Sequence, residues 1–504
     1  MIHGNWFQSW ARVVPEKAAL IEAESGKIVT YRQLENLTWQ TCQFLRELGL
    51  NKGDRVAVLG QNRIEQIILY FAAARLGLIL VPANWRLAPQ EVDYVLEHSS
   101  ARCLFWSADV DKLFSSLQKR PQTVVGFDHP EGQNFYNLIN KYPARPPEEV
   151  ELEEKTPLML LYTSGTTGRP KGAVLTHGSI TWNAIITSTC WDLRHDDITI
   201  THTPLFHTGG WNVLTLPLLH RGATVVLCNR FEPSLTLEWI ARYRVSVMFA
   251  VPTMFQMLLD EKPKREQLAS ARFFISGGAP CPVPLIRAWQ ELGLVFKQGY
   301  GLTEVGPNCF VLHERDAVRK AGSVGFPVLH LDSRIADDKG REVGPEEIGE
   351  LQLRGPTVCG GYFNDPRATA EAMLEGGWFR TGDLFRRDAE GYHYVVGRLK
   401  EMYISGGENV YPAEIERVLY EYSGVKEAAV VGVPHPKWGE VGAAFVALAP
   451  GSGPVDAEKI LDFCRSRLAR YKVPKTLRVL DVLPKGASGK IQKSELKALA
   501  VKEQ

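Results

Sequence analysis

The chain has 504 residues, of which 45% are hydrophobic and 23% charged, and its 58 basic and 57 acidic side chains give a formal net charge of +1. This length predicts at least two domains, and the composition is typical of a globular enzyme. The balanced charge gives no one-signed field that would attract nucleic acid, and no known nucleic-acid motif is present.

The cysteines and the N-terminus indicate a reduced, cytoplasmic protein. None of the eight cysteines forms a CxxC pair, and they are too sparse for a disulfide framework. The first residues show no charged-then-apolar signal pattern. The longest apolar run, residues 67–81, is interrupted by Arg75 and is too short for a membrane helix. We therefore expect no transmembrane segment, leave only peripheral membrane contact open, and expect a monomer or a homodimer.

The first half of the chain alternates helical periodicity with short apolar runs. Residues 31–48 predict a helix, a turn rich in Gly and Asn follows, and residues 55–59 predict a buried strand. Residues 67–81 predict a buried helix that leads into a strand. The short-strand pattern recurs at residues 222–227, 245–251 and 272–276. Such alternation predicts an α/β fold with parallel-rich sheets covered by helices.

The pattern changes after about Gly349. Residues 350–354 and 391–396 predict short strands separated by turns, which indicates a small antiparallel, β-barrel-like subdomain. The last part of the chain has its own predicted core, with helices at 413–422 and 457–469 and strands at 425–433 and 442–449. We expect a large N-terminal domain over residues 1–399 and a small α+β domain over residues 400–504.

The most informative segment is residues 162–172, YTSGTTGRPKG, which follows a predicted strand at residues 158–161. Its three glycines let the backbone turn tightly, and its hydroxyl groups and Lys171 supply donors for phosphate oxygens. The Walker pattern cannot be fitted to it, which disfavours a P-loop NTPase. A solvated surface loop is the alternative for such a segment taken alone.

This segment closely resembles the phosphate loop of the adenylate-forming superfamily, which includes acyl-CoA synthetases, aryl-CoA ligases, luciferases and peptide-synthetase adenylation domains. Further motifs with the same resemblance follow in the expected order over nearly the whole chain: PLFH at 204–207, GGAP at 277–280, QGYGLTE at 298–304, WFRTGD at 378–383, GR at 397–398, SGGENVYP at 405–412 and PKGASGK at 484–490. The resemblance implies that the small C-terminal domain is mobile.

The implied reaction joins a small-molecule carboxylic acid to CoA, with ATP and Mg²⁺ as the other requirements. The implied ATP- and AMP-binding residues are Thr163, Ser164, Gly165, Thr166, Thr167, Gly168, Lys171, Gly278, Ala279, Gln298, Gly299, Tyr300, Gly301, Thr303, Asp383 and Arg398. Tyr300 would offer an aromatic face to adenine, and Asp383 would accept hydrogen bonds from the ribose, although an Asp in Thr-Gly-Asp is often only a turn residue. Glu304 would bind Mg²⁺, which prefers oxygen ligands.

The resemblance also implies a catalytic set and a moving hinge. The catalytic residues would be Lys490, His207, Glu304 and Thr163. A lysine near a C-terminus is ordinarily a solvated tail residue, but Lys490 resembles the lysine that bridges the substrate carboxylate and the α-phosphate. Lys400 occupies the hinge position. The residues expected at CoA are Gly406, Gly407, Trp438, Arg86 and Tyr471, of which the last three have ordinary packing or surface roles as the alternative.

The acid itself is expected to be a medium- to long-chain fatty acid, with an aryl acid of the coumarate, ferulate or benzoate type as the alternative. The expected acyl pocket comprises His207, Gly209, Trp211, Val251, Gly277, Gly301, Pro307 and Asn308. Thr208 stands where amino-acid-activating relatives usually carry Asp, which disfavours an amino acid. Trp211 would either limit the depth of the pocket or point into the core. Asn308 and Cys309 add polarity that an alkyl pocket does not require.

Two alternatives belong to other functional classes. A luciferase-like oxygenase would share every ATP motif. A non-catalytic nucleotide-binding homologue would be expected to lose Lys490 or Glu304, and both are present.

Overall fold

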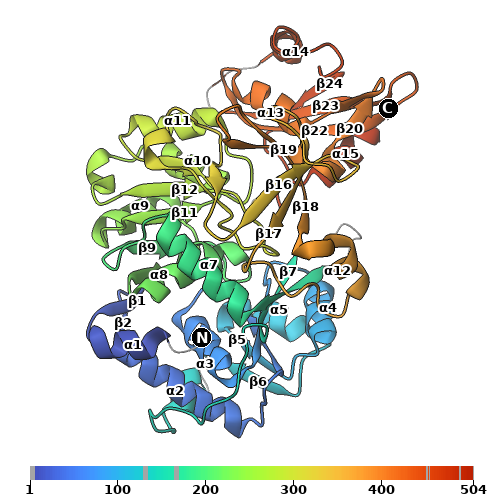
Figure 1. Cartoon of the computed structure of the whole chain (residues 1–504). Helices are drawn as coiled ribbons and strands as arrows, with labels where there is room; N and C mark the ends of the chain where they lie inside the picture. The colour runs from blue at the N-terminus through green and yellow to red at the C-terminus, as the bar shows by residue number, and fades with distance from the viewer. Residues whose placement is uncertain are drawn as a thin grey trace.

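The computed structural model describes residues 6–128, 134–163, 170–449, 452, 455–486 and 490–502, apart from the side chain of Phe7. The chain runs from the blue N-terminal elements at the bottom of Figure 1 to the red C-terminal elements at the top. None of the helices in these ranges combines the length and the apolar character needed to span a bilayer.

The first sheet has six strands in the order β6-β5-β3-β4-β7-β8, all parallel except β8. Its strands are β3 (Arg55–Leu59), β4 (Ile79–Ala83), β5 (Cys103–Trp106), β6 (Thr123–Gly126), β7 (Pro157–Thr163) and β8 (Lys171–Thr176). Val56 and Val58 face one core, whereas Ala57 and Leu59 face another. Burial on both faces explains why β3 is a continuous apolar run.

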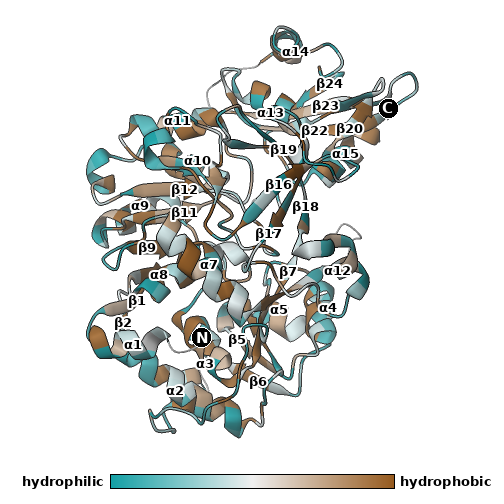
Figure 2. Ribbon diagram, viewed as in Figure 1, coloured by the Kyte–Doolittle hydropathy of each residue, from teal (hydrophilic) through white to brown (hydrophobic). Residues whose placement is uncertain are grey.

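Six helices accompany this sheet: α1 (Trp6–Val13), α2 (Tyr31–Glu47), α3 (Ile64–Leu76), α4 (Pro89–Ser99), α5 (Asp111–Ser116) and α6 (Phe135–Ile139). Thr30 and Gln33 form a capping box that begins α2. The α3 helix is buried nearly all round, and Figure 2 shows its hydrophobic colour. The predicted helix at 67–81 that leads into a strand is therefore confirmed as α3 followed by β4.

The central region contains two further sheets, ordered β2-β1-β10-β9 and β11-β12-β13. Its strands are β1 (Ala18–Glu22), β2 (Ile28–Thr30), β9 (Ile198–Thr201), β10 (Thr224–Leu227), β11 (Val247–Ala250), β12 (Phe273–Ser276) and β13 (Phe296–Gln298). Its helices are α7 (His177–Cys190), α8 (Thr215–Arg221), α9 (Pro233–Arg242), α10 (Pro252–Asp260) and α11 (Val283–Glu291), with a π-helical turn, η2 (Gly209–Val213). All pairs except β1–β2 are parallel, as the alternating pattern predicts.

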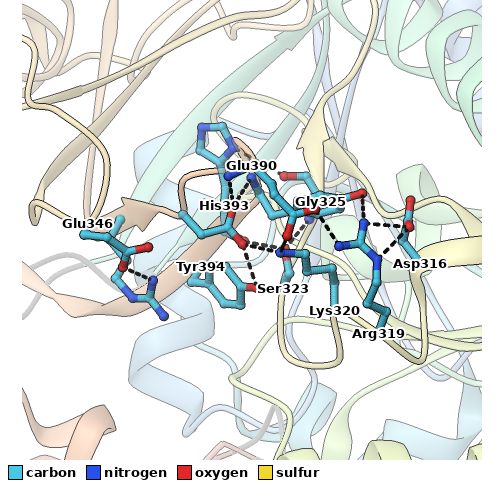
Figure 3. A network of polar contacts seen from close by, with 12 residues as sticks. Asp316, Arg319, Lys320, Ser323, Gly325, Glu346, Glu390, His393 and Tyr394 are labelled. Carbon is cyan, nitrogen blue, oxygen red and sulfur yellow. Dashed lines mark hydrogen bonds and ion pairs between the residues drawn. The ribbon is translucent and has the colours of Figure 1, made fainter.

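An antiparallel sheet follows, ordered β16-β17-β18-β19 and joined to a two-stranded ribbon by a bridge between Gly325 and His393. Its elements are β14 (Phe310–Val311), β15 (Phe326–Pro327), β16 (Asp332–Ala336), β17 (Gly349–Arg354), α12 (Pro366–Ala372), β18 (Phe379–Arg387) and β19 (His393–Arg398). Lys320 forms ion pairs with Asp388 and Glu390, both at 2.6 Å (Figure 3). This network anchors the β18–β19 hairpin, whose strands carry Asp383 and Arg398.

The C-terminal elements form their own sheet, ordered β21-β20-β23-β22 with β24 beside β23, and pack two apolar cores against it. They are β20 (Tyr403–Ser405), β21 (Glu408–Val410), α13 (Pro412–Tyr420), β22 (Val425–His435), β23 (Gly439–Leu448), α14 (Ala457–Arg465), β24 (Thr476–Val479) and α15 (Lys493–Val501). The short helix η6 (Leu399–Glu401) connects β19 to this sheet. Lys426 of β22 pairs with Asp260 of α10 at 2.7 Å.

Candidate active site

A cleft of about 2590 Å³ is lined by side chains from the first sheet, the central sheets, the antiparallel sheet and the C-terminal elements. Strands β7, β11, β12 and β13 all end at it, as expected for a ligand site beside the carboxyl ends of parallel strands. The expected site residues that line it are Arg86, Thr163, Lys171, His207, Gly209, Val251, Gly277, Gly278, Ala279, Gln298, Gly299, Tyr300, Gly301, Thr303, Glu304, Pro307, Asn308, Asp383, Arg398, Lys400 and Lys490.

The phosphate segment connects β7 to β8 in a hairpin that the sequence did not predict. Thr163 and Lys171 lie opposite each other across this antiparallel pair. Residues 164–169 lie outside the described part of the chain, and with them Ser164, Gly165, Thr166, Thr167 and Gly168. The ammonium group of Lys171 lies 5.3 Å from the centre of the Tyr362 ring, so the described end of the hairpin faces Tyr362.

Glu304 is held by two hydroxyl groups at the end of the cleft where the nucleotide is expected, called the nucleotide end below. Thr163 Oγ1 donates to Glu304 Oε1 at 3.3 Å, and the Tyr362 hydroxyl donates to the same oxygen at 3.0 Å. Both bonds end on Oε1, so within the described residues Oε2 is the oxygen available to a cation. One carboxylate fits Mg²⁺, which usually takes few protein ligands and fills its shell with phosphate and water oxygens. Tyr362 belongs to none of the sequence motifs, and it was not predicted as a site residue.

Asp383 is 3% exposed and is the centre of a polar triad. Its Oδ2 accepts from the Tyr300 hydroxyl at 2.6 Å, and its Oδ1 pairs with Arg398 Nε at 2.8 Å. Burial raises the pKa of Asp383, while Arg398 and the Tyr300 hydrogen bond oppose that shift. The Tyr300 ring packs edge-on against Phe385 at 4.7 Å, which fixes its orientation in the cleft.

The loop after β12 is shaped by its glycine and by Gln298. Gly278 has a φ of +81°, which a side chain would strain. The Gln298 side chain accepts a hydrogen bond from the backbone N–H of Cys281 at 2.8 Å. Gln298 therefore holds the loop that places Gly278 and Ala279 at the cleft.

Lys490 enters the cleft from the C-terminal elements and meets groups of the other regions. Desolvation within the cleft and the charge of Arg398 lower the pKa of Lys490, whereas Asp383 and Glu401 oppose that shift. Burial, and then the charges of Lys490 and Arg86, lower the pKa of His207 to about 4. His207 is consequently neutral near pH 7, and its Nε2 is buried without a hydrogen-bond partner in the described part of the chain.

The residues expected at CoA separate into two groups. Arg86 lies at the cleft, where its guanidinium is 4.8 Å from the centre of the Trp85 ring. Gly406, Gly407, Trp438 and Tyr471 do not line the cleft in this arrangement. Gly406 and Gly407 form the exposed turn between β20 and β21, and the Gly406 N–H donates at 2.9 Å to the carbonyl of Trp438, which lies between β22 and β23. The structure therefore does not bring these four residues together with Lys490.

The end of the cleft where the acid is expected, called the acyl end below, has an aromatic wall, Phe249. A methyl group at Gly209 would come within 3.0 Å of one edge of this ring, and one at Gly277 within 3.2 Å of the other. Each glycine therefore makes room for Phe249. The sequence reasoning missed Phe249, although its place near the end of β11 was a usable signal.

Trp211 does not belong to the acyl pocket, contrary to expectation. Its side chain is 0% exposed, packs on Tyr70 with ring centres 5.1 Å apart, and donates its N–H to the Leu205 carbonyl. The π-helical turn η2 directs it into the core, where a large indole with a satisfied N–H is stable. Cys309 is also buried away from the cleft, so of the two polar residues expected there only Asn308 lines it.

Comparison with protein families and curated sequences gives consistent matches. The AMP-binding enzyme family matches residues 7–363, and the AMP-binding enzyme C-terminal domain matches residues 414–490. The chain is 40% identical to a feruloyl-CoA synthase of Amycolatopsis sp, with 98% of each chain covered. It is 39% identical to an indoleacetate–CoA ligase of Aromatoleum aromaticum, covering 99% and 98%. It is 36% identical to a long-chain fatty acid–CoA ligase of Mycobacterium tuberculosis, covering 97% and 96%.

Solved structures agree with this fold. The ATP-bound MatB of Rhodopseudomonas palustris superposes with a TM-score of 0.90 at 30% identity, covering 99% of both chains. The o-succinylbenzoate CoA synthetase of Bacillus subtilis, in complex with ATP and a magnesium ion, gives a TM-score of 0.85 at 34% identity, covering 98% and 99%.

Proposed function

Because this chain belongs to the AMP-binding enzyme family and is an acid–thiol ligase, we propose that it joins an aryl carboxylic acid to CoA through an acyl-adenylate. The observation that carries the choice of acid is the Phe249 ring, fixed between Gly209 and Gly277. An aromatic wall favours a planar ring that stacks or packs edge-on against it. The similarity to a feruloyl-CoA synthase and an indoleacetate–CoA ligase supports the same acid class.

The first half-reaction joins the acid to AMP. A carboxylate oxygen attacks the α-phosphorus of ATP, the bond to the bridging oxygen breaks, and pyrophosphate leaves with that electron pair. Lys490 stabilises the charge that develops between the carboxylate and the α-phosphate. Asp383 accepts from the ribose hydroxyls while Tyr300 and Arg398 hold it. Glu304, with phosphate oxygens, would hold Mg²⁺, which neutralises phosphate charge when bound.

The second half-reaction needs a path for the CoA thiol to the adenylate. The CoA thiol gives up its proton to solvent, the thiolate attacks the acyl carbon, and the bond to the phosphate oxygen breaks, so that AMP leaves with that electron pair. Residues 400–504 rotate about Lys400 relative to residues 1–399, which withdraws Lys490 and brings Gly406 and Gly407 to the cleft. The exposed position of this hairpin in the present arrangement is consistent with such a movement.

A fatty acid is the second candidate substrate. It is favoured by the 36% identity to a long-chain fatty acid–CoA ligase over nearly the whole chain. Met254 and Met257, which also line the cleft, are flexible apolar side chains that can accommodate an alkyl chain.

The test measures the pyrophosphate that is released from ATP in the presence of Mg²⁺ and each acid of a panel, with and without CoA. The panel pairs aryl acids (cinnamates, benzoates and arylacetates) with alkyl acids of increasing length. We expect CoA-dependent turnover that is highest with an aryl acid. A maximum that follows alkyl chain length would overturn the aryl proposal and support the fatty-acid candidate. No signal with any acid would contradict the ligase mechanism.

A further inference from the structure

The Asn308 amide lies at the acyl end of the cleft and is held on one side only. The side chain is 4% exposed. Its Nδ2 is within hydrogen-bond distance of three oxygens: Thr187 Oγ1 at 2.8 Å, the Val213 carbonyl at 3.0 Å and the Asn212 carbonyl at 3.2 Å. Elements α7 and η2 therefore surround the NH₂ group with acceptors.

These acceptors determine which way the amide points. Flipping the amide about its Cβ–Cγ bond would exchange Oδ1 and Nδ2 and place Oδ1 against two carbonyl oxygens. These oxygens would repel it, because they have no hydrogen to donate. In the observed orientation Oδ1 is buried and has no hydrogen-bond partner among the described residues. A buried carbonyl oxygen without a hydrogen-bond donor raises the free energy of the folded protein. We therefore expect this oxygen to meet a donor when the site is occupied.

The place of this oxygen relates it to the substrate. Asn308 lines the cleft together with Val213, Gly301 and Pro307, on the acyl side. Its NH₂ group faces α7 and η2, which leaves the carbonyl oxygen as the part of the amide without a partner among the described residues. The π-helical turn that presents two of the acceptor carbonyls is a distortion common at functional sites.

The geometry points to Asn308 as a specificity residue whose Oδ1 accepts a hydrogen bond from a donor on the ring of the acid, a phenolic hydroxyl or a ring N–H. This inference rests on the proposed aryl-acid function and narrows it to aryl acids that carry a donor. An acid without one would leave Oδ1 unpaired on binding. Sites built to bind a substrate OH or NH discriminate strongly against the analogue that lacks it.

The test compares matched acids on the wild-type enzyme. The pairs are para-hydroxycinnamate with para-methoxycinnamate and with cinnamate, and indoleacetate with its N-methyl analogue. We expect kcat/KM to be roughly tenfold or more higher for the member of each pair that has the donor. Equal kcat/KM within each pair would overturn the inference while leaving the aryl-acid proposal intact. Turnover of alkyl acids alone would instead overturn the aryl-acid proposal.

Two variants assign the discrimination to Asn308. Asn308→Leu keeps the size of the side chain and removes the acceptor, so the preference for the donor acid should fall to within about twofold. Uniform loss over donor and donor-free acids would show a merely structural role and overturn the inference. ATP binding and the unfolding temperature report on folding, and Asn308→Ala replaces Asn308→Leu if the latter does not fold. Thr187→Val removes one acceptor of the NH₂ group and should weaken the preference only partly.

Discussion

The two ends of the cleft differ in how their polar groups are satisfied. At the nucleotide end both oxygens of Asp383 are paired, and Glu304 Oε1 accepts two hydroxyl groups. At the acyl end Asn308 Oδ1 and His207 Nε2 are buried without partners in the described part of the chain. Under the proposed function the nucleotide is common to every turnover, which fits an end of the cleft that is preorganised by bonds within the protein. The acid differs among relatives, and its partners are left open.

The largest effect should come from Lys490, a charged group that reaches the cleft from the C-terminal elements. Lys490→Ala should lower the adenylation rate by about 10²–10³-fold, because a positioned charge is lost from the transition state. CoA transfer from a supplied acyl-adenylate should stay nearly intact. Pyrophosphate release and acyl-CoA formation, measured separately, check the two steps.

Lys400→Pro is the matched counterpart, because it stiffens the hinge and leaves the charge of Lys490 in place. It should spare adenylation and slow CoA transfer. If both variants lose both steps equally, the domains do not alternate about Lys400.

Asp383→Asn tests the paired nucleotide end directly. The change removes the charge from two short hydrogen bonds, and ATP binding should weaken by about 10–100-fold. Tyr300→Phe is the matched control, since it deletes one of those bonds and keeps the ring, so the KM for ATP should rise less. An unchanged KM for ATP in Asp383→Asn would contradict the ribose role.

Tyr362→Phe sharpens the same comparison at Glu304. Loss of one hydrogen bond to a carboxylate should raise the Mg²⁺ concentration needed for half-maximal activity by about tenfold. Direct titration of Mg²⁺ in the presence of ATP gives a readout besides turnover. Tyr394→Phe, which deletes a hydroxyl bonded to Asp388 in the network of Figure 3, should leave the Mg²⁺ requirement unchanged.

Phe249→Leu addresses the acyl end. Replacing the ring by an alkyl group of similar size should raise the KM for aryl acids by about two- to tenfold, since an aromatic contact is lost. The KM for an alkyl acid should change little, which makes the alkyl acid an internal control. A parallel loss for both acids would indicate that Phe249 supports the fold and does not contact the acid.

His202 predicts a pH dependence of stability, because it is buried and neither of its ring nitrogens has a hydrogen-bond partner among the described residues. Burial lowers the pKa of His202 to about 4, against an ordinary value near 6.5, so the unfolded chain binds the proton more readily. Stability is therefore lost as pH falls, by ~0.7 kcal/mol for this residue between pH 7 and pH 6. His202→Gln should reduce that slope in chemical denaturation, whereas the same change at the exposed His195 should not. Equal slopes in all three proteins would exclude His202 as the cause.

Local pattern predicted much of the fold because many elements are specified by their own residues. The strand at 55–59 is correct to the residue, and a helix was expected at 31–48 where α2 is found. The helix expected at 457–469 ends earlier, at Arg465. Strand β8 was missed because its residues continue a phosphate motif, and only pairing with β7 makes them a strand.

The sequence by itself determined the chemistry, since the phosphate, nucleotide and C-terminal lysine motifs are continuous strings that carry their own identity. The tertiary structure decided how residues distant in the chain meet. Tyr362 reaches Glu304 across 58 positions, and Lys490 enters a cleft built by three other regions. It also decided that Trp211 faces the core and that Phe249 lines the cleft. The physical reason is that a side chain's surroundings depend on which elements pack beside it, and no local pattern records that packing.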